Sequence, residues 1–159
     1  MVQKTSAWPL ALVYAVLIVF ASLFPFDGWR AQGIDPLVFL TAKIPPPYWT
    51  WFDININIVG YAPLGFFLAL ALVRSGSPRA AVPLAALAGT LLSLGMEFLQ
   101  IYLPRRVPSN LDLVLNAGGT LLGALVALLL ERLGALARWS AFRTHWLGED
   151  GGGAMVLLL

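Results

Sequence analysis

Seven polar residues stand inside long apolar segments of the chain, at spacings that place them on helix faces. They are Asp53, Asn57, Tyr61, Glu97, Gln100, Asp112 and Asn116. Residues three or four positions apart share one face of a helix, so each of three segments carries its own polar stripe. Ionisable side chains in membrane helices usually face a bundle interior or a water-filled cavity. We therefore expect the three stripes to converge on one polar pocket, where carboxylates and amides would hold hydroxyls or amides of a ligand.

Two arginines, Arg105 and Arg106, lie between the second and third stripes and complete the predicted pocket. We expect them to pair with Glu97, Asp112 or both. Arginine also binds phosphate or carboxylate groups bidentately, so either guanidinium could hold the anionic part of a ligand. Two interpretations stay open at this point. The pocket faces a ligand, or Glu97, Arg106 and Asp112 form a buried ionic clasp that locks two helices together.

The composition is that of an integral membrane protein. The 159 residues are 59% hydrophobic and 11% charged, against about 45–50% and 25% in soluble domains, and the mean hydropathy is +0.81. These values exclude a soluble enzyme, a disordered protein and a nucleic-acid-binding domain. The chain has no cysteine and one histidine, His145, so we expect no metal centre and no cofactor.

Four apolar segments approach the length of about 20 residues that a helix needs to cross a bilayer. They cover approximately residues 8–24, 54–73, 80–103 and 111–130. We expect the first to be an uncleaved span rather than a signal peptide. Apolar residues at every third or fourth position of 133–146 predict an amphipathic helix on the membrane surface. Residues 1–146 would thus form one all-α, four-helix transmembrane domain, with 147–159 as a flexible tail that ends in apolar residues.

Small residues accompany each polar stripe and predict close helix packing. Gly65 continues the first stripe, Gly89 precedes the second, and Gly119 and Gly123 form a G-x-x-x-G pair after the third. Glycines at this spacing let helix backbones approach closely in lipid. Pro63 removes a backbone hydrogen bond and predicts a kink.

The distribution of basic residues gives an orientation through the positive-inside rule. Six cations fall on the side of both termini: Lys4, Arg74, Arg79, Arg132, Arg138 and Arg143. Four fall on the other side: Arg30, Lys43, Arg105 and Arg106. The bias predicts that both termini are cytoplasmic and that the pocket lies in the outer leaflet. The long outer loop 27–53, rich in proline and aromatic residues, would be functional or would bind a partner.

Four motifs in this order resemble those of the VanZ-like family of small bacterial membrane proteins. They are Asn57-x-x-x-Tyr61-x-Pro63-Leu64-Gly65, Glu97-x-x-Gln100, Pro104-x-Arg106 and Asp112-x-x-x-Asn116-x-x-Gly119. The resemblance covers about residues 53–130. It implies a multi-pass protein of the bacterial cytoplasmic membrane. The family's namesake is associated with low-level glycopeptide resistance, so the resemblance implies cell-envelope lipids or glycopeptides as the class of ligand.

The sequence is compatible with three functions. The first is a protein that binds the headgroup of an envelope amphiphile in the outer-leaflet pocket. The alternative is an accessory subunit of a larger membrane complex, held to other integral membrane subunits by the loop 27–53 and the tail. The third is an enzyme with Glu97 or Asp112 as a general base. It is the weakest, because the sequence has no recognisable nucleophile elbow, phosphate loop or metal set. Membrane lipids are expected partners and nucleic acid is not.

Overall fold

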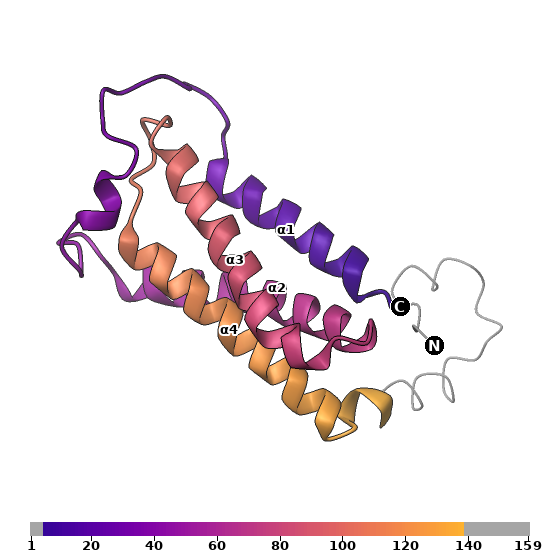
Figure 1. The fold of residues 1–159 in the computed structure, drawn as a ribbon. Coiled ribbons are helices and arrows are strands. Elements are labelled where there is room, and N and C mark those ends of the chain that lie inside the picture. The colour runs from indigo at the N-terminus through magenta and orange to yellow at the C-terminus, as the bar shows by residue number, and fades with distance from the viewer. Residues whose placement is uncertain (1–4, 139–159) are drawn as a thin grey trace.

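The computed structural model describes residues 5–138 as a bundle of four α-helices (Figure 1). The elements are α1 (Ala7–Leu23), the 3-10 turn η1 (Val38–Thr41), α2 (Trp51–Arg74), α3 (Pro78–Gln100) and α4 (Asn110–Arg132). Successive helices run in opposite directions. The α2–α3 turn therefore lies at one end of the bundle with the start of α1, and we call this the turn end. The connections 24–50 and 101–109 lie at the opposite end, the loop end (Figure 1).

Three of the four helices are long and apolar enough to cross a membrane, namely α2, α3 and α4. The remaining helix, α1, is also apolar but has only 17 residues, which is the lower limit of the range of about 17–25 found in spans. Many large apolar side chains on all four helices face outward, as expected where the surrounding solvent is lipid. The chain is an all-α membrane protein.

The helix boundaries differ from the predicted ones by up to three residues. Helix α2 begins at Trp51 rather than at 54, because Thr50 and Asp53 form a capping box that satisfies its first turn. Helix α3 ends at Gln100 rather than at 103, and residues 101–103 turn toward Pro104, a residue type before which helices usually end. Pro63 lies inside α2 without ending it.

The core of the bundle is the contact between α2 and α4, which is the most extensive between any two described elements. A side chain at Gly119 would collide with the backbone of Ile58, and one at Gly123 with the backbone of Ala62. From the α2 side, a side chain at Gly65 would collide with the backbone of Thr120. The predicted role of these glycines in close packing is confirmed.

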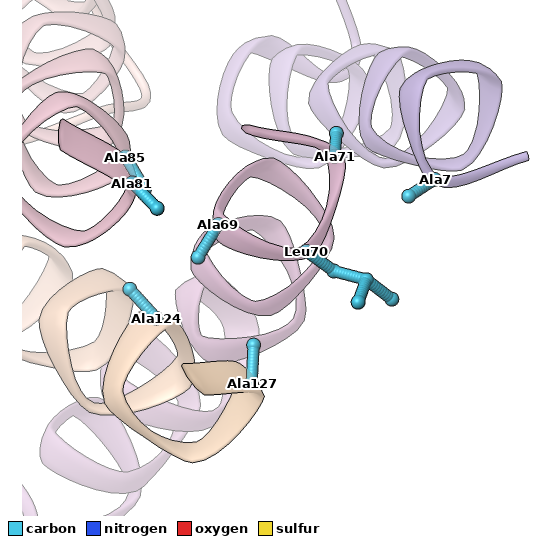
Figure 2. Packing of buried hydrophobic residues seen from close by; sticks show 8 residues of the cluster. All are labelled: Ala7, Ala69, Leu70, Ala71, Ala81, Ala85, Ala124 and Ala127. Carbon is cyan, nitrogen blue, oxygen red and sulfur yellow. The ribbon is translucent and has the colours of Figure 1, made fainter. Parts of the chain in front are cut away.

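Small side chains also hold the turn end together. Figure 2 shows the alanine cluster, which consists of Ala7, Ala69, Leu70, Ala71, Ala81, Ala85, Ala124 and Ala127. All four helices contribute to it. Because lipid tails are as apolar as leucine, helices in a membrane gain little from hydrophobic burial and associate by van der Waals contact, which small residues favour.

The connection 24–50 is packed against the α3–α4 connection at the loop end. Arg30 N donates to Tyr102 O at 3.0 Å, and the Gln32 side chain donates to Ile101 O at 2.6 Å. The Asn110 side chain donates to Ala42 O at 2.6 Å. Phe39 of η1 is buried. These bonds fix the loop in place above the helix ends that carry the polar stripes.

The predicted amphipathic helix 133–146 is described only at its beginning. Helix α4 ends at Arg132, Gly134 follows it with a φ of +65°, and residues 135–138 form one further helical turn. Leu136 packs against the alanine cluster. The rest of this segment and the predicted tail 147–159 lie outside the described residues.

The contact between α2 and α4 predicts a strong effect of one added methyl group. Gly123→Ala should destabilise the protein by about 1–3 kcal/mol, the usual cost of overpacking, because its Cβ would meet the Ala62 carbonyl. Gly118→Ala is the matched control, since a Cβ at Gly118 meets nothing. Thermal unfolding in detergent measures both. Equal melting temperatures for the two variants would contradict this packing.

Candidate functional site

A cavity of about 590 Å³ lies at the loop end of the bundle, between α1 and the other three helices. Its wall contains all nine residues that the sequence placed in one polar pocket: Asp53, Asn57, Tyr61, Glu97, Gln100, Arg105, Arg106, Asp112 and Asn116. The polar stripes of α2, α3 and α4 therefore do converge.

The stripe of α2 is anchored by its own first turn. The Asp53 carboxylate accepts from the backbone N and the hydroxyl of Thr50 at 2.8 and 2.7 Å. The Asn57 side chain donates to Asp53 O at 2.9 Å. One turn further in, Tyr61 is 5% exposed, and its hydroxyl has no hydrogen-bond partner among the described residues.

Glu97 connects the end of α3 to the start of α4. Its side chain, in a residue only 3% exposed, accepts from Ser109 N at 2.7 Å. Ser109 is the N-cap of α4, and its hydroxyl accepts from Asp112 N at 3.4 Å. One carboxyl oxygen of Glu97 is thus used for helix positioning, and this placement brings the Asp112 side chain to the same cavity.

Asn116 lies deepest on the α4 stripe and is 4% exposed. Its amide nitrogen donates to the Ser93 hydroxyl at 2.9 Å. Its carbonyl oxygen, Oδ1, has no partner among the described residues. Most buried polar atoms in proteins are hydrogen-bonded, so each exception requires an explanation. Asn116 and Tyr61 give two such exceptions on one cavity wall.

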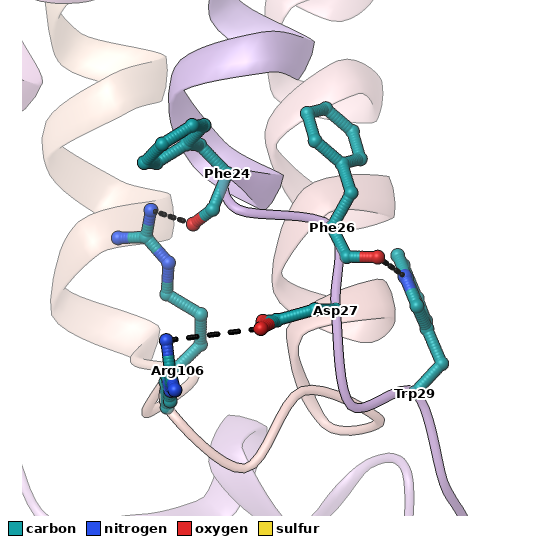
Figure 3. A network of polar contacts seen from close by, with 6 residues as sticks. Phe24, Phe26, Asp27, Trp29 and Arg106 are labelled. Atoms are coloured by element: carbon teal, nitrogen blue, oxygen red, sulfur yellow. Dashed lines mark hydrogen bonds and ion pairs between the residues drawn. The ribbon is translucent and has the colours of Figure 1, made fainter.

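Arg106 does not form the predicted ion pair. Its guanidinium donates to Ala21 O at 2.9 Å. It also donates to Phe24 O at 2.8 Å (Figure 3). The Gln100 side chain donates to Ser22 O at 3.2 Å. The last carbonyls of a helix have no partner within the helix, so these two residues cap the C-terminus of α1.

Arg105 also lies away from the carboxylates of the cavity. It pairs with Asp27 at 3.8 Å, and the two side chains are 75% and 59% exposed. Within residues 5–138, neither Glu97 nor Asp112 forms an ion pair. The predicted pairing is wrong, and so is the ionic clasp built on it, because backbone carbonyls and Asp27 are the groups that hold the arginines.

The cavity has a polar wall and an apolar rim. Its apolar lining residues from α1, α2 and the α3–α4 connection include several that are at least half exposed. These are Leu17, Phe52, Ile56 and Val107. In a membrane such side chains contact lipid, so a molecule in the cavity would touch acyl chains at the rim and polar groups inside.

Comparison with known proteins places the chain in a family. A model of the VanZ/LLP1 family matches residues 8–131. The chain belongs to the VanZ/LLP1 family. No curated protein and no solved structure matches it. The family match includes α1, which the motifs at 53–130 do not cover.

Helix α1 is the part of this VanZ-family site that the sequence motifs miss. Tyr14, Ile18 and Ser22 line the cavity and stand four residues apart. The sequence feature that could have placed α1 at the site is the pair of hydroxyl groups, on Tyr14 and Ser22, on one face of an otherwise apolar helix. That signal is weak, because hydroxyl side chains are common in membrane helices and often bond to other helices.

The acidic side chains of the site do not form a metal centre. Within the described part of the VanZ-family chain, no three acidic, histidine or cysteine side chains come close enough together to hold a metal ion. The carboxyl groups line a volume that is large enough for a small organic group.

The bonds made by Arg106 predict a loss of stability that is localised to α1. Arg106→Met keeps the length of the side chain and removes both donors, so it should cost about 1–3 kcal/mol. Amide hydrogen exchange in residues 20–27 should also become faster. Arg105→Met is the control, because an exposed ion pair contributes only about 0–1 kcal/mol. Unchanged exchange in Arg106→Met would show that α1 is held by other contacts.

Proposed function

We propose that this VanZ-family protein binds the headgroup of an envelope amphiphile, a lipid or a glycopeptide-like molecule, in the cavity at the loop end. The observation that carries the proposal is the pair of buried, unpartnered polar atoms, Tyr61 Oη and Asn116 Oδ1, on the cavity wall. A buried polar group without a hydrogen bond costs about 2–7 kcal/mol. A ligand with donor and acceptor groups would remove that cost.

The size of the cavity and its rim favour an amphiphile over water or a small ion. A volume of about 590 Å³ lies within the range of about 300–1,000 Å³ typical of small-molecule sites. The exposed apolar side chains at the rim, including Phe52 and Ile56, would contact an acyl chain. A headgroup could thus occupy the polar interior while its tail stays in the bilayer.

Arg105 is the arginine that we assign to an anionic group of the ligand. Arg106 already uses one guanidinium nitrogen for two carbonyls of α1, and these bonds support the cavity wall. Arg105 lines the cavity with a largely exposed side chain and a long ion pair to Asp27. Its guanidinium could therefore exchange Asp27 for a phosphate or carboxylate at little cost.

The alternative, an accessory subunit, has less support. It depends partly on residues 147–159, which lie outside the described residues. The loop 27–53 contacts its own chain through Arg30, Gln32 and Ala42. These bonds support a role for the loop in building the loop end of its own chain.

Blocking the cavity tests the proposed function. Gly60 lines the cavity, and a Cβ added there meets nothing, so Gly60→Phe should fill the site without disturbing the helices. We expect native mass spectrometry of the purified protein to show bound amphiphiles in the wild type and about tenfold less in Gly60→Phe. Gly118→Phe, at a helical glycine that is equally open but away from the cavity, should retain them. Equal retention in the two variants would refute amphiphile binding in this cavity.

We further propose that the loop end faces the outside of the bacterial cytoplasmic membrane and that both termini are cytoplasmic. Arg105 and Arg106, two of the four cations on the loop side that oppose the positive-inside rule, have local bonding partners, namely Asp27 and the carbonyls of α1. Their presence there therefore has a structural reason apart from topology. The remaining cations favour a cytoplasmic turn end.

Single cysteines can test this orientation, because the chain has none of its own. Ala31→Cys in the loop and Ser77→Cys in the turn are both at exposed positions. A membrane-impermeant maleimide applied to spheroplasts should label Ala31→Cys and should label Ser77→Cys only after lysis. The reverse pattern would place the cavity in the inner leaflet.

A further inference from the structure

Three carboxyl groups line the cavity without a cation from the described chain. Asp53, Glu97 and Asp112 come from three different helices, and none forms an ion pair with a described lysine or arginine. The two arginines in the same wall are bonded to Asp27 and to the carbonyls of α1. The cavity interior is therefore acidic, and its basic groups point to other partners.

The three carboxyl groups differ in the hydrogen bonds that they already form within the protein. Asp53 is used in the capping box of α2, and Glu97 has one oxygen bonded to Ser109 N. The Asp112 side chain forms no ion pair with a described residue, and its backbone N is bonded to Ser109. Asn116, one turn further along α4, adds the unpartnered acceptor Oδ1. Two carboxyl groups without a cation and one unpartnered acceptor thus line the cavity beside the α3–α4 connection.

An unpaired carboxylate inside a membrane is costly, and such groups usually pair with an opposite charge. A primary ammonium group carries one positive charge and three N–H donors. Its three donors could bond to three acceptors of the cavity wall, namely a free oxygen of Glu97, the Asp112 carboxylate and Asn116 Oδ1. A quaternary ammonium has the charge but no donors. An anionic or uncharged headgroup would leave the carboxylates unpaired.

Resting on the function proposed above, we propose that the bound headgroup carries a primary ammonium group, held by Glu97, Asp112 and Asn116, next to a phosphate held by Arg105. The ligand class is an aminophospholipid with a zwitterionic headgroup. The order of charges in the wall agrees with this class, since Arg105 is at the exposed edge and Glu97 and Asn116 are buried. The phosphate would lie near the rim and the ammonium inside.

A competition between three phospholipids tests the headgroup. The full chain, purified in detergent, is mixed with equal amounts of phosphatidylethanolamine, phosphatidylcholine and phosphatidylglycerol that have identical acyl chains. Native mass spectrometry then measures the bound lipid. We expect phosphatidylethanolamine to be enriched about tenfold over the other two, which is the effect of one charged hydrogen bond. Equal binding of phosphatidylcholine would overturn the ammonium proposal, and so would preferred binding of phosphatidylglycerol.

Two conservative substitutions assign the preference to residues. Asp112→Asn and Glu97→Gln keep the shape of each side chain and remove its charge, and the glutamine can still accept from Ser109 N. Each should abolish the preference for phosphatidylethanolamine while binding of phosphatidylglycerol stays or increases. Glu131→Gln, which removes a carboxylate at the turn end, should keep the preference. Undiminished preference in both Asp112→Asn and Glu97→Gln would overturn the assignment.

Failure of this inference is distinguishable from failure of the proposed function. If Gly60→Phe loses its bound lipid but the wild type does not prefer phosphatidylethanolamine, the cavity binds amphiphiles and the ammonium proposal is wrong. If Gly60→Phe retains as much lipid as Gly118→Phe, the binding function itself is wrong. Thermal unfolding of each variant verifies that a loss of lipid does not come from unfolding.

Discussion

The contact between the backbones of α2 and α4 is the constraint on which the rest of the bundle depends. Glycines on α4 lie directly against carbonyls of α2, at Ile58 and Ala62. In lipid, where hydrophobic burial gives little drive for association, such close contact supplies much of the attraction between helices. It also sets the register of the two polar stripes, so that Tyr61 and Asn116 reach one cavity wall.

The polar side chains around the cavity divide into those that build it and those that remain available. Arg106, Gln100 and Ser109 satisfy helix ends, which in a membrane have no water to bond to. Tyr61 and Asn116 each have a polar atom that no described residue satisfies. Sequence alone treats both sets as equal members of a polar pocket. Their hydrogen bonds separate structural support from candidate binding groups.

The sequence predicted which side chains would meet but not what each would bond to. Helical spacing places Asp53, Asn57 and Tyr61 on one face. Small residues further along that face predict that it packs against a neighbouring helix. The partners of Arg106 were not predictable, because backbone carbonyls at a helix end are the same for every sequence. The role of α1 was missed for a related reason: its contribution comes largely from apolar side chains and from main-chain oxygens.

The apolar rim of the cavity affects how the occupancy of the site by a ligand would depend on the concentration of that ligand. A ligand that reaches the site sideways, with its tail among neighbouring lipids, is already confined to two dimensions and partly oriented. Occupancy then follows the mole fraction of that ligand in the leaflet rather than its concentration in the aqueous phase. A site with few favourable contacts can therefore be saturated by an abundant membrane component and respond steeply to changes in bilayer composition.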